Sequence, residues 1–331
     1  MNLEKWNEYH QNQTERDVSK LLHLFDEVLK MVVMYYGLQT IKEEFFSFTL
    51  YPVLNNKVKS LFKKFNNVFS QKMNYCIDKH YQLSKDKFKD VFTNIHHSQK
   101  GEDTLQSLVM KEKKRMLSGR VWNLTQQYRT EIEMALDVAI HEGTPANQLT
   151  SVLKKYLQNP DTLFRKYRDK NGILQLSQKA KEYRSGQGVY RSAYKNAERL
   201  ARTEINIAYR TADIERWQSM DMIVGYEIKR SKHPHGCEIC DMMKGIYPKS
   251  FVWVGNHPNC RCYMTPVFKK DIAGKEITIN NKLTEWISDN ENRITNAKGI
   301  PMFLWGIDNQ SKGVSQKVIQ AIQFFSKKKL P

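Results

Sequence analysis

The sequence predicts a mostly α protein, in which an N-terminal helical region precedes a small α+β domain with a zinc knuckle and a helical C-terminal extension. Two observations predict this class. Apolar residues recur at spacings of three and four along most of the first 185 residues, and a short alternating pattern near residue 225 is followed by clustered cysteines. With 331 residues, 40% of them hydrophobic, the chain can bury two or three cores. Wholesale disorder is therefore not expected.

The N-terminal helical region is assigned to residues 1–185. A first helix is predicted before Gly37 by the apolar face Val18, Leu21, Leu22, Phe25, Val28, Leu29 and Val32. A second is predicted before Gly143 by Val121, Leu124, Tyr128, Ile132, Ala135, Leu136 and Ala139. Thr144 and Pro145 then start a third helix, which Asn159 and Pro160 end. We interpret these faces as core or helix-pairing surface rather than as a cofactor site.

The α+β domain is assigned to residues 186–268. It begins with a helix from about Tyr190 to Met220. Val224, Tyr226 and Ile228 then alternate with charged residues, which predicts a strand. A second short strand is predicted at 262–268, where Pro266 confines it to a sheet edge.

The C-terminal extension, residues 269–331, begins as a charged connector. A helix is predicted from the apolar residues Leu283, Trp286, Ile287, Ile294 and Ala297. The last stretch, from Ser311 to Pro331, holds five lysines and no acid. It is either a solvated helix or an arm that binds acidic surfaces.

Charge and hydropathy narrow the class of partner. The chain has 53 Lys and Arg against 35 Asp and Glu, a formal charge of +18, which favours an anionic partner such as nucleic acid. No window reaches the roughly 18 apolar residues of a membrane span, and the N-terminus lacks the apolar core of a signal peptide. We therefore expect a soluble protein made in a cytoplasm, with no membrane partner.

Four of the five cysteines fall within 26 positions, which favours a metal site over a disulfide framework. The pattern is Cys237-x-x-Cys240 followed by His257-x-x-Cys260-x-Cys262, and thiolate with imidazole is the donor set of zinc. We favour Cys237, Cys240, His257 and Cys260 as ligands, because C-x-C is the tighter chelate. Cys262 stands in reserve, with His233 and His235 as further candidates. Four protein ligands leave no place for water, so this zinc would be structural; the alternative is a set of buried thiols.

Arg202-Thr203-Glu204 interrupts the apolar side of the helix from Tyr190 to Met220. The triplet is either an exposed ion pair or an internal brace that fastens the helix to the cysteine-bearing loop. Because Glu204 lies near Ala201 and Ile205 on the helix, we favour the brace. Neither interpretation makes these residues catalytic.

Three motifs occur in order: RSAYKNAERLARTEINIAYRTADIERW at 191–217, CEICD at 237–241 and HPNCRC at 257–262. With the strand GYEIKRS between them, they resemble the Mu F-like minor head protein family of tailed bacteriophages, also called the phage head morphogenesis domain. The resemblance covers about 186–268, a quarter of the chain. The segment at 286–309 is similar to an extension that some members carry.

The resemblance implies a non-enzymatic minor capsid protein in the virion, at the portal and capsid interior. Its partners would be the portal protein, the scaffold or major capsid protein, and packaged DNA, which it would touch or help eject. The motif positions are Arg202, Thr203, Glu204, Cys237, Cys240, His257, Cys260 and Cys262. Many members have Asp four residues before the first motif cysteine, where this chain has His233, so His233 stays a possible ligand. Some relatives carry a toxin domain further on, but the roughly sixty residues after Phe268 show no recognisable catalytic set.

Two other functions share the basic charge and the cysteine cluster. One is a metal-dependent nuclease acting on DNA, and the other is a zinc-containing nucleic-acid-binding protein of a host. The nuclease would need a second set of His or Asn residues to hold its metal ion, and this sequence shows none. Any DNA binding should be indifferent to sequence, because no recognition helix or aromatic platform is visible.

Overall fold

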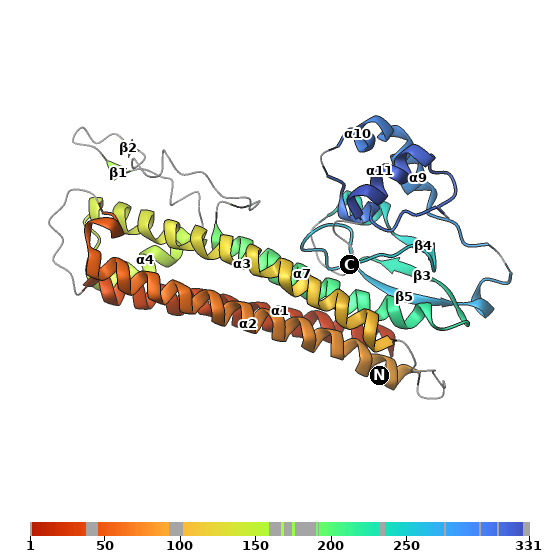
Figure 1. The fold of residues 1–331 in the computed structure, drawn as a ribbon, viewed down its shortest axis with the longest axis horizontal. Helices are drawn as coiled ribbons and strands as arrows, with labels where there is room; N and C mark the ends of the chain where they lie inside the picture. Colours follow the sequence, from red (N-terminus) through yellow and green to blue (C-terminus); the bar gives the residue numbers. More distant parts are fainter. Residues whose placement is uncertain are drawn as a thin grey trace. The chain divides into compact units, whose positions relative to one another are not determined.

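The computed structural model describes residues 2–37, 46–92, 102–158, 167–168, 174–175, 190, 192–231, 236–274, 276–297, 299–309 and 311–326. Helices dominate this part of the chain, so the predicted mostly α class is confirmed (Figure 1). The chain divides into two compact units. The first unit combines Met1–Glu15, Cys76–Lys113 and Arg202–Pro331, and the second unit combines Arg16–Tyr75 and Lys114–Ala201.

These units do not coincide with the consecutive segments 1–185, 186–268 and 269–331 that the sequence suggests. Each unit is assembled from separated stretches, because four long helices contribute residues to both. A helix of 40 residues is about 60 Å long, which exceeds the width of one compact core. The four helices are α1 (Leu3–Gly37), α2 (Pro52–Val91), α3 (Glu102–His141) and α7 (Ala193–Gln218).

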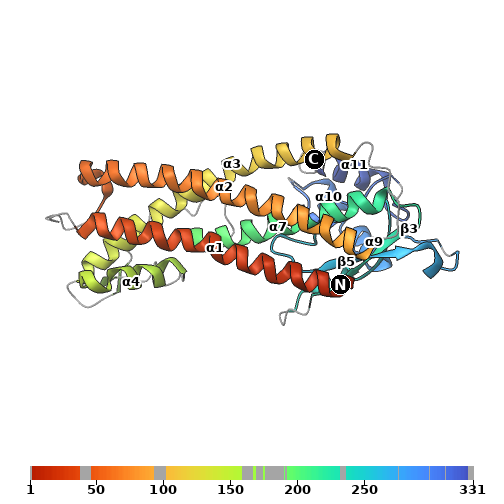
Figure 2. The ribbon, with the colours of Figure 1, turned by 90° about the horizontal axis from the view of Figure 1, so that it is seen from below.

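The second unit is a helical assembly with an aromatic core. Its parts of α1 and α2 run side by side, joined by residues of η1 (Phe48–Leu50), and α4 (Ala146–Gln158) belongs to the same unit (Figures 1 and 2). The Phe25 ring lies 4.9 Å from that of Phe65 and 4.6 Å from that of Tyr128. The Tyr128 hydroxyl donates to the Phe25 carbonyl at 2.6 Å. The apolar faces predicted for 18–32 and 121–139 are both buried.

The second unit also holds a strand pair that the sequence analysis missed. Strands β1 (Tyr167–Arg168) and β2 (Leu174–Gln175) pair antiparallel. Two-residue strands are too short to show an alternating pattern, which is why the sequence gives no signal.

The first unit contains a three-stranded antiparallel sheet in the order β4-β3-β5. Strands β3 (Ile223–Lys229) and β5 (Tyr263–Phe268) are the two that the sequence predicts, and Pro266 does lie on an edge strand. Strand β4 (Gly245–Pro248) was not predicted, because its four residues are too few to show an alternating pattern. A Cβ at Gly225 would lie 2.3 Å from the Tyr247 carbonyl oxygen, so the pairing of β3 with β4 requires glycine there.

The predicted C-terminal helices share the core of this sheet and do not form a separate extension. They are α9 (Asn281–Asp289), α10 (Glu291–Thr295) and α11 (Gln316–Ser326), gathered together in Figure 1. Leu283, Ile294 and Ile322 are buried in one cluster with Trp217 and Tyr226. Shorter helices complete the unit: α8 (Glu238–Met242), η2 (Lys269–Asp271) and η3 (Met302–Leu304).

The start of α1 belongs to the first unit. The Trp6 indole N–H donates to Asp90 on α2 at 2.7 Å, and Gln11 donates to the Arg261 carbonyl at 3.1 Å. In the described part of the chain, no helix combines the length and the apolar character that crossing a membrane requires.

Candidate metal centre

The cysteines and the histidine of the predicted knuckle come from two connections within the sheet. Cys237 and Cys240 lie between β3 and β4, and His257, Cys260 and Cys262 lie between β4 and β5. Cys237 is the N-cap of α8, and its sulfur accepts the Cys240 backbone N–H at 3.4 Å. This tight turn brings the two sulfurs to one side of a prospective metal ion.

His257 faces both sulfurs of the C-x-x-C turn. Its Nε2 lies 3.3 Å from the Cys237 sulfur and 3.2 Å from the Cys240 sulfur. In a tetrahedral zinc site with Zn–S of about 2.3 Å and Zn–N of about 2.0 Å, a sulfur and a nitrogen would be about 3.5 Å apart. The three atoms therefore have nearly the spacing of metal ligands.

The other ring nitrogen of His257 fixes the tautomer. Nδ1 lies 2.8 Å from the Pro258 carbonyl oxygen, which can only accept, so Nδ1 carries the proton. In the neutral ring Nε2 is then the unprotonated nitrogen, with its lone pair directed at the two sulfurs. A backbone carbonyl on the second nitrogen is the usual support of a metal-ligating histidine.

A second triad shares Cys240 with the first. The sulfurs of Cys240, Cys260 and Cys262 lie within 4.8 Å of one another, as do the ligand atoms of Cys237, Cys240 and His257. These five residues form a cluster that can hold a metal ion, and all four predicted ligands belong to it. Because the sulfurs of Cys260 and Cys262 both lie within 4.8 Å of the Cys240 sulfur, they are alternative fourth ligands. His233 and His235 lie outside the described residues.

The electrostatics of the three buried sulfurs favour a cation. Hydrogen bonds with Cys240 and Cys262 hold the pKa of the Cys260 thiol well below its ordinary value, and Arg210 adds to this effect. Hydrogen bonding with the neighbouring thiols raises the pKa of both Cys240 and Cys262. Negative charge is thus favoured on Cys260 over Cys240 and Cys262. A bound metal ion would compensate the charge of further thiolates.

Helix α7 braces the loop that carries His257 and Cys260. Arg202 donates to the Asn259 side-chain oxygen at 2.5 Å, and the Asn259 backbone N–H donates to the Thr203 hydroxyl at 2.8 Å. Asn259 has a positive φ of 69°, a conformation that asparagine tolerates better than most residues. Arg202 and Thr203 thus fasten α7 to this loop, while the part that the sequence analysis gave to Glu204 in an Arg/Glu brace stays a prediction. Glu204 is buried on the same helix, but the acid that pairs with Arg202 is Glu15, at 2.8 Å.

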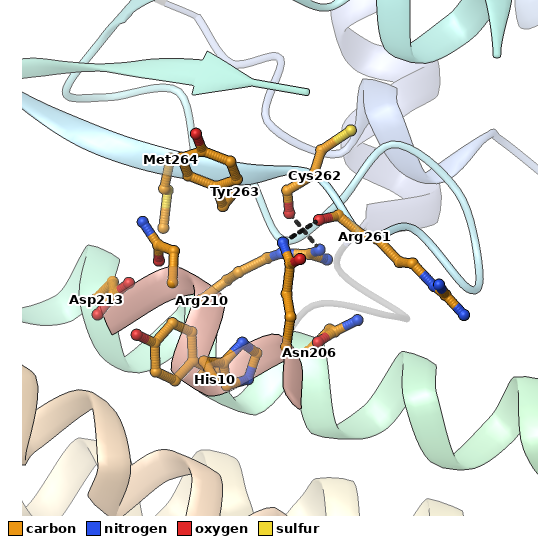
Figure 3. Close-up of a pocket in the computed structure, with 11 residues that line it drawn as sticks. His10, Asn206, Arg210, Asp213, Arg261, Cys262, Tyr263 and Met264 are labelled. Atoms are coloured by element: carbon orange, nitrogen blue, oxygen red, sulfur yellow. Dashed lines mark hydrogen bonds between the residues drawn. The ribbon is translucent and has the colours of Figure 1, made fainter. Parts of the chain in front are cut away.

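Two further α7 residues hold the Cys-x-Cys segment, and the sequence analysis missed both. Asn206 donates to the Cys260 carbonyl at 3.0 Å. Arg210 donates to the carbonyls of Cys260 and Cys262 at 2.8 and 2.6 Å, and Figure 3 shows it reaching from α7 toward Cys262. The available signal was spacing, because residues four apart from Arg202 lie on one helix face.

The approach of Arg210 also explains a glycine. Its Nη1 donates to the Val254 carbonyl at 2.8 Å, beside Gly255. A Cβ at Gly255, which has a φ of +143°, would lie 2.6 Å from that nitrogen. Glycine at 255 is thus required both by the backbone conformation and by the space that Arg210 fills.

Comparison of the chain with family models, with curated proteins and with solved structures found no match.

Proposed function

We propose that this chain is a minor head protein of a tailed bacteriophage, acting in head morphogenesis at the portal and capsid interior. The observation that supports it best is the meeting of the three motif segments at one centre. Arg202 and Thr203 of the first motif both bind Asn259 of the HPNCRC segment, and His257 of that segment faces the two CEICD cysteines. Segments up to 57 positions apart thus form one interdependent unit, as expected of a shared domain.

In this proposal the metal is zinc and its role is structural. Thiolate and imidazole donors suit zinc better than they suit magnesium or calcium, which prefer oxygen ligands. The cluster offers five donors for the four coordination positions of zinc. A further thiol, and not water, is therefore at hand to complete the coordination. The ion would join the two connections of the sheet, and its binding energy would become folding energy.

The arrangement of His257 argues against the nuclease alternative. Its Nδ1 donates to the Pro258 carbonyl and its Nε2 faces the cysteine sulfurs. Once a metal is bound, neither nitrogen is free to accept a proton from water. In this proposal the protein acts without catalysis, and its partners are the portal protein, the scaffold or major capsid protein, and DNA.

The direct test is detection of the chain in virus particles. We expect a few copies per particle in purified virions and in assembling procapsids, measured by quantitative mass spectrometry against the major capsid protein. Absence from both kinds of particle would overturn the proposal. Incubating the purified protein with plasmid DNA and divalent metals tests the alternative, since cleavage that disappears in His257→Ala would identify a nuclease.

A further inference from the structure

One face of α2 in the second unit carries a dense group of lysines. Between Pro52 and Ile77 the helix has no acidic residue. All five lysines of this stretch are exposed, and we call them the basic face of α2: Lys57, Lys59, Lys63, Lys64 and Lys72. The charge is thus concentrated locally and is not only a property of the whole composition.

None of these five lysines has an ion-pair partner among the described residues. Elsewhere in the same unit, Lys154 binds Asp26 at 2.6 Å. In the basic face, the contact of Lys57 is with a ring, since its Nζ lies 5.6 Å from the centre of Tyr35. Like charges four residues apart, as at Lys59 and Lys63, destabilise a helix. An anionic partner would remove this repulsion.

The lysines flank a neutral polar ridge. The buried side of α2 is formed by Leu54, Val58, Phe62, Phe65, Phe69 and Met73, at spacings of three and four. Helical geometry places Lys57 and Lys64 along one edge of the opposite side and Lys59 and Lys63 along the other. Lys72 lies about 60° from Lys57, next to the buried side, and its side chain is exposed there. Between the two edges lie exposed side chains that can donate hydrogen bonds: Asn56, Ser60, Asn67 and Gln71.

The dimensions and chemistry of this face suit the backbone of duplex DNA. Lys57 to Lys72 spans about 22 Å along the helix, the length of about six to seven base pairs. Lysine, asparagine, glutamine and serine are all common phosphate ligands. Single strands are held mainly by stacking on aromatic side chains, and the face offers one exposed aromatic residue, Tyr75 at its end. A uniform row of donors and cations matches a regular polyanion better than an irregular acidic protein surface.

We propose that the basic face of α2 is a binding surface for the phosphate backbone of duplex DNA, without sequence preference. The inference deepens the proposed function by placing the DNA contact on a named surface. It relies on that function only for the biological origin of the DNA, because a purified protein shows the binding with any duplex.

The test is a salt titration of binding to a fluorescent 20-base-pair duplex of arbitrary sequence. If the five lysines contact five phosphates, the slope of log affinity against log salt is about −4.5 from this surface alone, which is a roughly 500-fold loss between 50 and 200 mM salt. Replacing all five lysines with glutamine, which keeps helix propensity, should reduce the magnitude of the slope by about 4.5 and abolish binding at 150 mM salt.

A matched control removes the same charge elsewhere. The control variant has glutamine in place of five other exposed lysines: Lys30, Lys155, Lys195, Lys270 and Lys317. The control variant should keep most of the slope, and circular dichroism should show both variants helical. Equal losses in the two variants, or no loss in the first, would overturn the surface assignment.

Polyglutamate that binds with the same affinity and the same dependence on these lysines would show an acidic protein surface to be the partner instead. Particle composition is measured separately, so failure here is distinguishable from failure of the proposed function.

Discussion

The aromatic core of the second unit and the metal centre of the first unit are organised by different forces. Phe25 is completely buried and contacts the rings of Phe65, Phe69 and Tyr128, so burial of apolar surface dominates that packing. In the centre, the segments around Cys237 and His257 depend on polar contacts and on the sulfur and imidazole donors. The comparison shows that helical faces can be stabilised locally, whereas short loops need a ligand or a brace to have one conformation.

The largest difference should follow from metal removal. Chelation should loosen the two connections, 236–244 and 254–262, because coordination contributes on the order of 10 kcal/mol in isolated zinc modules. The second unit should stay folded. Hydrogen exchange read by mass spectrometry, before and after dialysis against a chelator, measures both regions in one experiment.

Variants and elemental analysis sharpen this result. Cys240→Ser should lower the metal content from about one ion per chain to near zero, since Cys240 belongs to both triads. Cys76→Ser serves as the control, because Cys76 is buried outside the cluster, and it should leave the metal content unchanged. A folded centre in metal-free protein would show that the cysteines are ordinary buried thiols.

The second largest effect should come from the aromatic core. Phe25→Ala should destabilise the second unit by about 3 to 5 kcal/mol, because it removes a fully buried ring and leaves a cavity. Denaturant unfolding followed by circular dichroism measures the change. Metal content should be unaffected, and loss of metal in this variant would contradict the separation of the two regions.

A smaller effect should come from the α7 brace. Arg202→Gln removes charge-assisted hydrogen bonds to Asn259 and Glu15, and we expect a loss of about 2 to 3 kcal/mol. Metal affinity should fall about tenfold, as it does when supporting residues of metal ligands are lost. Competition with a chromogenic chelator gives the affinity. Lys195→Gln, a change at an exposed lysine of the same helix, is the control and should leave the affinity unchanged.

The sequence predicted what depends on local periodicity and spacing. The apolar faces of α1 and α3, strand β3 and the edge position of Pro266 all follow from residues near one another in the chain. The knuckle residues were found because C-x-x-C and H-x-x-C are local chelates. Asn206 and Arg210 were missed because they bind backbone carbonyls about 50 positions away, and carbonyls have no sequence signature. The two units were missed because their boundaries fall inside continuous helices.

The smallest predicted effect concerns a buried histidine in the first unit. His10 stacks on Tyr209 of α7 with ring centres 3.6 Å apart, and its ring is 5.0 Å from that of His80 on α2. The basic groups that act on it are His80, Arg210 and Lys87, while Asp213 is held by Lys87 at 2.5 Å. A proton on His10 would add a cation to this cluster. Burial and, next, the neighbouring His80 hold the pKa of His10 well below its ordinary value.

The lowered pKa of His10 sets the sign of the pH dependence of stability. Below about pH 6.5 the unfolded chain binds a proton at His10 and the folded chain does not, so stability is full above that pH and falls as the pH drops. One such group contributes a loss of up to about 2 kcal/mol at pH 5. His10→Phe, which keeps a ring against Tyr209, should flatten the profile between pH 6.5 and 5 relative to the parent chain in denaturant unfolding. His23→Gln, at an exposed position of α1, should leave the profile unchanged, and an equal flattening in both variants would contradict the assignment to His10.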